Sequence, residues 1–294
     1  MRTHGPWRVL VASDGSPEAR AGLQATVAFP WPRRTRASAV VARGAAPARP
    51  PAAVALAVDR AFARVVGEAR RILGRRWPRA GARLTDRWPV EGILAEARRL
   101  GARVVVVAPS GRGPLGRLLL GSVSRDVVRR APGAVLVVKG RPRRPRRVVL
   151  GFDASPHARR AVELVAHLVP PARGGVTLVR VVPLERRPPM PSHLPPAARV
   201  IVESRMAMVG AERLRAARPA AEAAARRLAQ RAWRVRVLVR LGNPLAELLR
   251  VAATERADLL VVGARGVGRL RGLVVGSVAD GVLNRAGVSV LLVR

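Results

Sequence analysis

The sequence of 294 residues contains no cysteine, which excludes disulfide bonds, thiol catalysis and zinc sites with cysteine ligands. It has no tyrosine and three phenylalanines, so few side chains are available on which nucleic-acid bases could stack. No apolar run approaches the roughly 20 residues that span a bilayer, and the start of the chain lacks the apolar core of a signal peptide. We therefore expect a cytoplasmic protein without a membrane partner.

Acidic residues are few and lysine is almost absent. Lys139 is the single lysine among 55 basic residues, and 18 acidic residues leave a formal net charge of +37. This charge predicts non-specific, salt-sensitive contact with nucleic acid at low salt. Because alanine, glycine, proline and valine are also abundant, a compositional bias is the simpler source of the arginine excess.

Two segments of the chain occur twice. Arg103–Val123 (RVVVVAPSGRGPLGRLLLGSV) matches Asp258–Val278 (DLLVVGARGVGRLRGLVVGSV), and Val9–Ala19 matches Val148–Ala158. A repeat of about half the chain is far longer than a solenoid unit and long enough to bury its own core. The sequence thus predicts two domains, and their expected limits are 1–139 and 148–294, with a stiff basic linker at 140–147.

Strands and helices alternate in both halves. The apolar runs Val104–Val107 and Leu259–Val262 are typical of buried parallel strands, and helices are expected to begin near Ser16 and Ser155, each followed by proline. This alternation predicts an α/β fold with a parallel, doubly wound sheet. The proline-rich segment Pro183–Pro219 is expected to be a surface loop before a helix at 220–232, although a flap over the ligand edge or a partner surface stays open.

The second copy carries the most informative motif. Gly263, Gly266, Gly276 and Ser277 follow a buried strand in a G-x2-G-x9-G-S spacing. Glycines let backbone N–H groups approach a ligand closely, and Ser277 is expected to cap the next helix, whose N-terminus attracts anions. The pattern indicates a phosphate cradle.

With these motifs in place, the chain resembles the universal stress protein family as a tandem two-domain member. The resemblance implies two Rossmann-like domains of the adenine nucleotide alpha hydrolase-like type. Each would have a five-stranded parallel sheet of order 3-2-1-4-5 with helices on both faces. It also implies ATP binding, with Mg²⁺ bridging the phosphate oxygens, and pairing of the two domains through their last strands. Further pairing of two chains into a homodimer stays open.

The resemblance also assigns roles to residues of the second half. Asp153 would hydrogen-bond the adenine or its surroundings, unless it only caps the following helix, and Val181 would contact the base. The ribose and phosphates would be lined by Gly263, Arg265 and Gly266, and the phosphates would be held by Gly276, Ser277 and Val278.

The first half departs from this pattern. Ala108 stands at the position of Gly263, Pro109 follows it and lacks an N–H, and Arg103 replaces Asp258. A weaker second site is therefore expected there, or none, on the residues that remain: Asp14, Gly111, Gly121 and Ser122.

No catalytic set is recognisable. The glycine loop lacks the lysine of a P-loop, so efficient NTP hydrolysis is not expected, and slow hydrolysis of bound ATP stays open. None of the histidines has metal-ligand spacing, and no protein-held metal is expected; they are His4, His157, His167 and His193.

The leading hypothesis is therefore an ATP-binding regulatory protein of the stress response, and not an enzyme. One alternative is a nucleotide-free interaction module of the same fold, supported by the altered first motif. The other is a non-specific nucleic-acid binder that uses the arginine-rich surface.

Overall fold

The computed structural model describes residues 6–44, 51–109, 120–184, 195–266 and 275–294. The first half contains β1 (Trp7–Ala12), α1 (Pro17–Ala28), β2 (Thr35–Ala42), α2 (Ala52–Gly74), β3 (Gly81–Thr85), α3 (Pro89–Leu100), β4 (Val104–Val107), α4 (Ser122–Arg130) and β5 (Ala134–Val137). The second half contains β6 (Arg147–Gly151), α5 (Pro156–His167), β7 (Gly175–Val182), α6 (Pro196–Ala229), β8 (Val235–Leu241), α7 (Pro244–Thr254), β9 (Leu259–Gly263), α8 (Ser277–Arg285) and β10 (Ser289–Val293).

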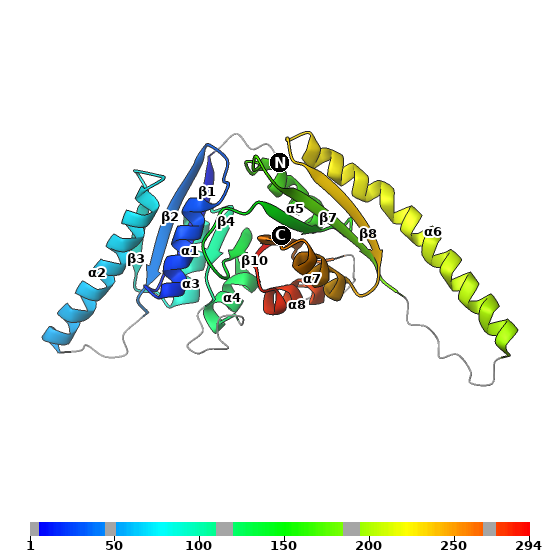
Figure 1. Cartoon of the computed structure of the whole chain (residues 1–294). Coiled ribbons are helices and arrows are strands. Elements are labelled where there is room, and N and C mark those ends of the chain that lie inside the picture. The colour runs from blue at the N-terminus through cyan, green and yellow to red at the C-terminus, as the bar shows by residue number, and fades with distance from the viewer. Residues whose placement is uncertain (1–5, 45–50, 110–119, 185–194, 267–274) are drawn as a thin grey trace.

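The ten strands form one sheet in the order β3-β2-β1-β4-β5-β10-β9-β6-β7-β8 (Figure 1). All pairs are parallel except β5 with β10, and each half reads 3-2-1-4-5 from its outer edge. One face packs against α1, α2, α5 and α6, and the other against α3, α4, α7 and α8. The predicted α/β class with a doubly wound sheet is confirmed. The β4 and β5 residues are buried throughout, as helices on both faces require.

The expected loop over Pro183–Pro219 is wrong for most of that segment. Residues 185–194 lie outside the described part, but α6 begins at Pro196 and runs through Pro219 without a break. A proline inside a helix removes one hydrogen bond, which made a helix start at 220 the natural expectation. The segment is otherwise rich in alanine, arginine, glutamate and methionine, which are strong helix formers. Buried Ala221 and Leu228 anchor the C-terminal part of the helix in the core.

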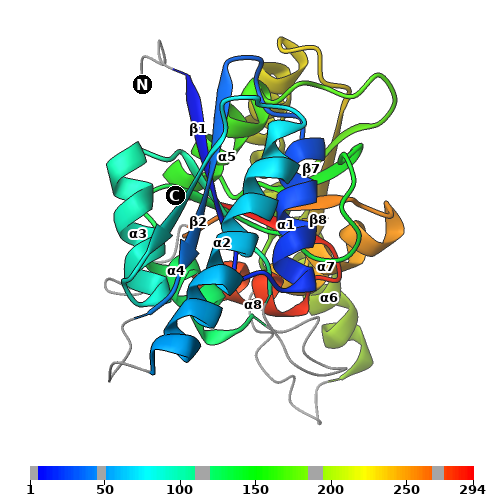
Figure 2. The ribbon, with the colours of Figure 1, turned by 90° about the vertical axis from the view of Figure 1, so that its left-hand side faces the viewer.

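Helices α2 and α6 extend past the strands they cover. Figure 1 shows their N-terminal ends at the lower left and the lower right, at opposite outer edges of the molecule and away from the sheet, and Figure 2 shows both ends low in the view. Apolar side chains are exposed on these ends, namely Val54, Leu56 and Val58 on α2 and Val200, Ile201, Val202, Met208 and Val209 on α6. The two ends therefore offer apolar surface that the sheet does not bury.

The two halves join through the antiparallel pair β5 and β10. Leu136 pairs with Leu291, its own counterpart in the 155-residue repeat, so a pseudo-twofold axis passes between them. Both side chains are at most 1% exposed, and the neighbouring pairs are valine and leucine. Pairing through the last strands, which the resemblance implied, is thus present within one chain and makes the sheet continuous.

The residue that follows each of these strands reaches into the other half. Lys139 Nζ donates to the carbonyls of Leu283 (2.7 Å) and Ala286 (2.9 Å) at the end of α8. Its counterpart Arg294 donates through Nη2 to carbonyls at the end of α4, those of Val128 and Arg129. Each half therefore caps a helix of the other with a cation, where the helix dipole favours positive charge.

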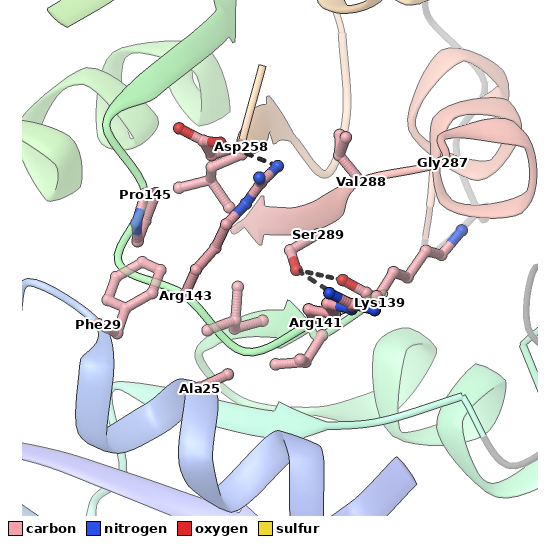
Figure 3. Close-up of a pocket in the computed structure, with 14 residues that line it drawn as sticks. Ala25, Phe29, Lys139, Arg141, Arg143, Pro145, Asp258, Gly287, Val288 and Ser289 are labelled. Carbon is pink, nitrogen blue, oxygen red and sulfur yellow. Dashed lines mark hydrogen bonds and ion pairs between the residues drawn. The ribbon is translucent and has the colours of Figure 1, made fainter. Parts of the chain in front are cut away.

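The linker is fixed by one carboxylate. The backbone N–H groups of Arg146 and Arg147 both donate to Asp258 Oδ2 at 2.9 Å, and Arg143 forms an ion pair with Oδ1 at 2.9 Å. Figure 3 shows this ion pair beside a cavity of about 230 Å³ between the halves, together with the hydrogen bonds between Lys139 and Ser289. Asp258, which the first half replaces by Arg103, serves here to anchor the linker.

We predict that Lys139 makes the free energy of unfolding rise with pH between about 8 and 10.5. Burial lowers the pKa of Lys139 from its ordinary 10.5 to about 8. In this window the amine is largely neutral in the folded protein and protonated in the unfolded chain. Because the unfolded chain then binds more protons, stability increases with pH, by at most about 1.4 kcal/mol per pH unit. Urea denaturation across this window measures the slope.

The composition of the chain leaves few other groups that titrate in this pH window. With no cysteine, no tyrosine and no other lysine in the chain, the N-terminal amine is the one further group that ordinarily titrates near this window. In Lys139→Met the stability should no longer rise with pH in this window. In Arg294→Met the matching helix cap is lost, but the rise of stability with pH should remain. Equal slopes in the wild type and Lys139→Met would contradict the prediction.

Candidate functional site

A cavity of about 300 Å³ opens at the carboxyl ends of β6, β7 and β9. It lies between β6 and β9, where the strand order reverses and where open α/β sheets bind ligands. The structure brings together all the residues that the sequence predicts for the second-half site, since each of them lines this cavity: Asp153, Val181, Gly263, Arg265, Gly266, Gly276, Ser277 and Val278.

Asp153 occupies a tight turn after β6. Its Oδ1 accepts from the N–H of Ser155 at 2.9 Å, and the Ser155 side chain caps α5 by accepting from the N–H of Ala158 at 3.1 Å. Ala154 between them has φ 64°, a left-handed conformation that costs alanine about 1 kcal/mol. Ser155, and not Asp153, is therefore the N-cap of α5, so the interpretation of Asp153 as that cap is wrong. The other carboxylate oxygen, Oδ2, faces Gly266 of the glycine loop.

Gly263 and Gly266 are required by close approaches. A Cβ at Gly266 would lie 2.6 Å from Asp153 Oδ2. A Cβ at Gly263 would lie 2.9 Å from the backbone nitrogen of Ala158 and 2.9 Å from the Cβ of His157. Both distances are shorter than atoms in contact allow, so these glycines let the loop rest against the start of α5 and the Asp153 carboxylate.

Hydrogen bonds fix both ends of the glycine loop. The N–H of Ala264 donates to the carbonyl of Val293 in β10 at 2.7 Å, and the Ser155 hydroxyl donates to the carbonyl of Arg265 at 3.1 Å. The N–H of Gly276 donates to the carbonyl of Ala264 at 2.8 Å. Residues 267–274 lie outside the described part, but the two ends of the loop are held beside each other.

The start of α8 differs from the expectation. Gly276 is the N-cap residue, with extended backbone angles, and Ser277 is the first helical residue. The expected capping by Ser277 is therefore wrong. No side chain of the described residues caps α8, whereas Ser155 and Asn243 cap α5 and α7. The first N–H groups of α8 thus remain available at the cavity, as an anion site requires.

The cavity is bordered by positive charge. The pKa of His157 lies below its ordinary 6.5 because of burial and, next, the charges of Arg160, Arg265 and Arg294, with Asp153 opposing them. His157 is consequently neutral at pH 7. Arg265 lines the cavity and is exposed, so its guanidinium is free to approach a ligand.

Sequence reasoning missed Arg180. This residue lies in β7 between Val179 and Val181 and lines the same cavity. Its Nε and Nη1 are buried and have no hydrogen-bond partner among the described residues. The available signal was an arginine within the otherwise apolar run VTLVRVV, at a position where the first half has Val41.

The first-half positions show a related but tighter arrangement. Asp14 Oδ1 accepts from the N–H of Ser16 at 3.0 Å, and a Cβ at the intervening Gly15 would lie 2.7 Å from the Val65 side chain of α2. Gly121 is the N-cap residue of α4 and Ser122 its first residue, as in α8. Gly111 lies outside the described residues.

Ala108 shows how the first half accommodates a side chain where the second half has Gly263. Its Cβ faces Gly22 of α1, at 3.7 Å from the place where a Cβ of Gly22 would be. Its carbonyl accepts from the Ser124 hydroxyl at 2.7 Å. The methyl group is therefore accommodated by the absence of a side chain on α1.

Among the residues that the structure describes, no three histidine, aspartate or glutamate side chains are grouped so that they could hold a metal ion. In the same ranges no helix is both long and apolar enough to cross a bilayer.

The comparisons with known proteins agree with this architecture. The chain is 32% identical over 207 residues to a universal stress protein of Mycobacterium tuberculosis, covering 66% of this chain and 62% of the relative. A universal stress protein of Thermus aquaticus is 33% identical over 148 residues, which cover 50% of this chain and 97% of that protein. The alignment thus spans about three fifths of the mycobacterial relative.

A solved universal stress protein of Archaeoglobus fulgidus shares the fold, with a TM-score of 0.63, 17% identity and coverage of 98% of this chain and 96% of that one. The model of the universal stress protein family matches twice, over residues 7–139 and 145–294. The chain therefore belongs to the universal stress protein family, as a tandem member with two such domains.

Proposed function

We propose that the protein binds ATP at the second-half cavity and acts as a regulatory, non-metabolic protein of the stress response in the cytoplasm. One observation carries the proposal: in one cavity meet the N-terminus of α8, which no side chain of the described residues caps, the glycines Gly263 and Gly266, and the carboxylate of Asp153. Helix N-termini attract phosphate, and glycine loops allow its close approach. Membership of the family supports the stress-response role.

Each part of the cavity suits one part of the nucleotide. Val179 and Val181 provide an apolar wall for adenine, and Asp153 Oδ2 is an acceptor for its amino group or for the ribose. Gly263, Arg265 and Gly266 suit the ribose and the first phosphates. At the start of α8, Gly276, Ser277 and Val278 suit the remaining phosphates. Mg²⁺ would be held by the phosphate oxygens and water, since Asp153 is the one carboxylate among the described residues that line the cavity.

The two halves would contribute unequally. In the first half, Pro109 lacks an N–H in the loop, Val41 replaces Arg180, and Val65 of α2 approaches the turn at Gly15. These features favour weaker binding there, or none. Regulation would follow from nucleotide-dependent shape or partner choice, because no histidine or lysine of the described residues lines the second-half cavity to support efficient hydrolysis.

A nucleotide-free interaction module is the second candidate. Its support is the exposed apolar surface at the N-terminal ends of α2 and α6, defined above. Exposed apolar residues gathered on one segment favour an interaction surface there. These ends of α2 and α6 and the second-half cavity are different parts of the molecule, so partner binding there would not need a bound nucleotide.

The first prediction is saturable ATP binding that depends only modestly on salt. A nucleotide held by backbone N–H groups and few charges should lose little affinity between low and near-physiological salt. Binding to nucleic acid through the arginine surface should fall steeply over the same range. Calorimetric titration of the full chain with ATP, after extraction of co-purified nucleotide, measures this. Neither retained nucleotide nor saturable binding would reject the proposal.

The second prediction concerns Gly266→Ala. The new Cβ would fall 2.6 Å from Asp153 Oδ2, so the loop and the carboxylate must separate. We expect ATP affinity to drop at least about tenfold, equivalent to about 1.4 kcal/mol. Gly287→Ala is the matched control, because its Cβ would meet nothing within 4 Å. Equal affinities in the two variants would show that the loop does not touch the nucleotide.

A further inference from the structure

No contact among the described residues accounts for the positive charge of Arg180. It belongs to β7, and its side chain is partly buried beside the cavity. Among the residues that the structure describes, Nε and Nη1 have no hydrogen-bond partner, and no ion pair includes Arg180. A guanidinium stays protonated at any physiological pH, so its buried donors stay unsatisfied at an energetic cost.

Four acidic side chains of this half form ion pairs with other arginines. Glu163 pairs with Arg227, Glu247 with Arg250, Glu255 with Arg236, and Asp258 with Arg143. Asp153 lines the same cavity, but one of its oxygens is bound by Ser155 and the other faces Gly266. Among the described residues, the cavity thus offers Arg180 no carboxylate that pairs with it, which favours an acceptor on the ligand.

The place of Arg180 in the sheet indicates which end of the ligand it meets. Two strand spacings, roughly 10 Å, separate β7 from β9, which leads into the glycine loop. The phosphates are proposed to lie on the far side, at the start of α8. A nucleotide laid across the cavity would therefore present its base to Arg180.

We propose that Arg180 turns into the cavity and donates hydrogen bonds to the edge of the purine base, so that guanine gains more from it than adenine does. Guanine offers two adjacent acceptors, O6 and N7, which a guanidinium binds with two hydrogen bonds. Adenine has its amino donor in place of O6 and leaves one acceptor there. This inference rests on the proposed nucleotide site and extends its ligand class to 6-oxopurine nucleotides.

The first half provides an internal comparison. Its equivalent residue, Val41, is fully buried in the core. A valine makes no hydrogen bond to a base, so the first half has no counterpart to this contact. Base discrimination would thus be a property of the second half alone.

The test compares Arg180→Met with Arg240→Met, an exposed arginine near the end of the neighbouring strand β8 that does not line the cavity. Affinities of the full chain for GTP and ATP are measured by calorimetry, and the melting temperature is measured without nucleotide. Arg180→Met should lower GTP affinity about tenfold to a hundredfold and ATP affinity by less, as expected for lost charge-assisted hydrogen bonds. Its melting temperature should stay equal or rise, because an unsatisfied buried cation is removed. Arg240→Met should change neither affinity.

Arg180→Lys tests the shape of the donor group. Lysine keeps the charge but lacks the planar fork, so the preference for GTP should fall while the fold is retained. Equal losses of ATP and GTP affinity, or unchanged affinities with a lowered melting temperature, would overturn the inference. A wild-type protein that binds neither nucleotide would instead reject the proposed function itself.

Discussion

The antiparallel pairing of β5 with β10 is the constraint on which the rest of the molecule depends. It joins two five-stranded sheets into one and buries Leu136 against its own repeat counterpart, Leu291. The same β10 accepts the hydrogen bond from Ala264 that fixes the first end of the glycine loop. A strand that links the halves on one side therefore positions the ligand cavity on the other, and the geometry of the site is tied to the integrity of the interface.

The cross-capping cations extend this dependence to the helices. Lys139 from the first half binds the last carbonyls of α8, and the N-terminus of that helix faces the cavity. Positive charge at one end and an anion at the other both suit the helix dipole. A side chain of the first half therefore holds the C-terminal end of the helix whose N-terminus borders the second-half cavity. The cavity and the first domain are thus structurally linked, although the glycine motif of the first domain is altered.

Much of the fold could be predicted from the sequence, because local patterns determine it. The signals are short-range: apolar runs such as Val104–Val107, glycine at turns, and serine followed by proline at helix starts. Because the two halves repeat each other, each signal occurs twice. The part of α6 before Pro219 was missed because proline is a strong local signal for a helix start, whereas the packing that keeps the helix continuous through Pro219, such as the burial of Ala221 and Leu228, is a tertiary effect. Expecting Ser277 as a cap failed for a similar reason: whether a hydroxyl or a glycine precedes the first helical residue depends on the loop path.

At the candidate site too, the sequence predicts which residues take part, whereas only the three-dimensional structure shows what they contact. Spacing selected the residues that line the cavity, but it could not say why each glycine is there. Gly266 is set by the Asp153 carboxylate and Gly263 by the start of α5, contacts between segments more than 100 residues apart. Arg180 had no motif to mark it, and only its unsatisfied nitrogens single it out. A family motif therefore identifies what two domains share, whereas the base contact proposed above depends on a difference between them, Arg180 against Val41.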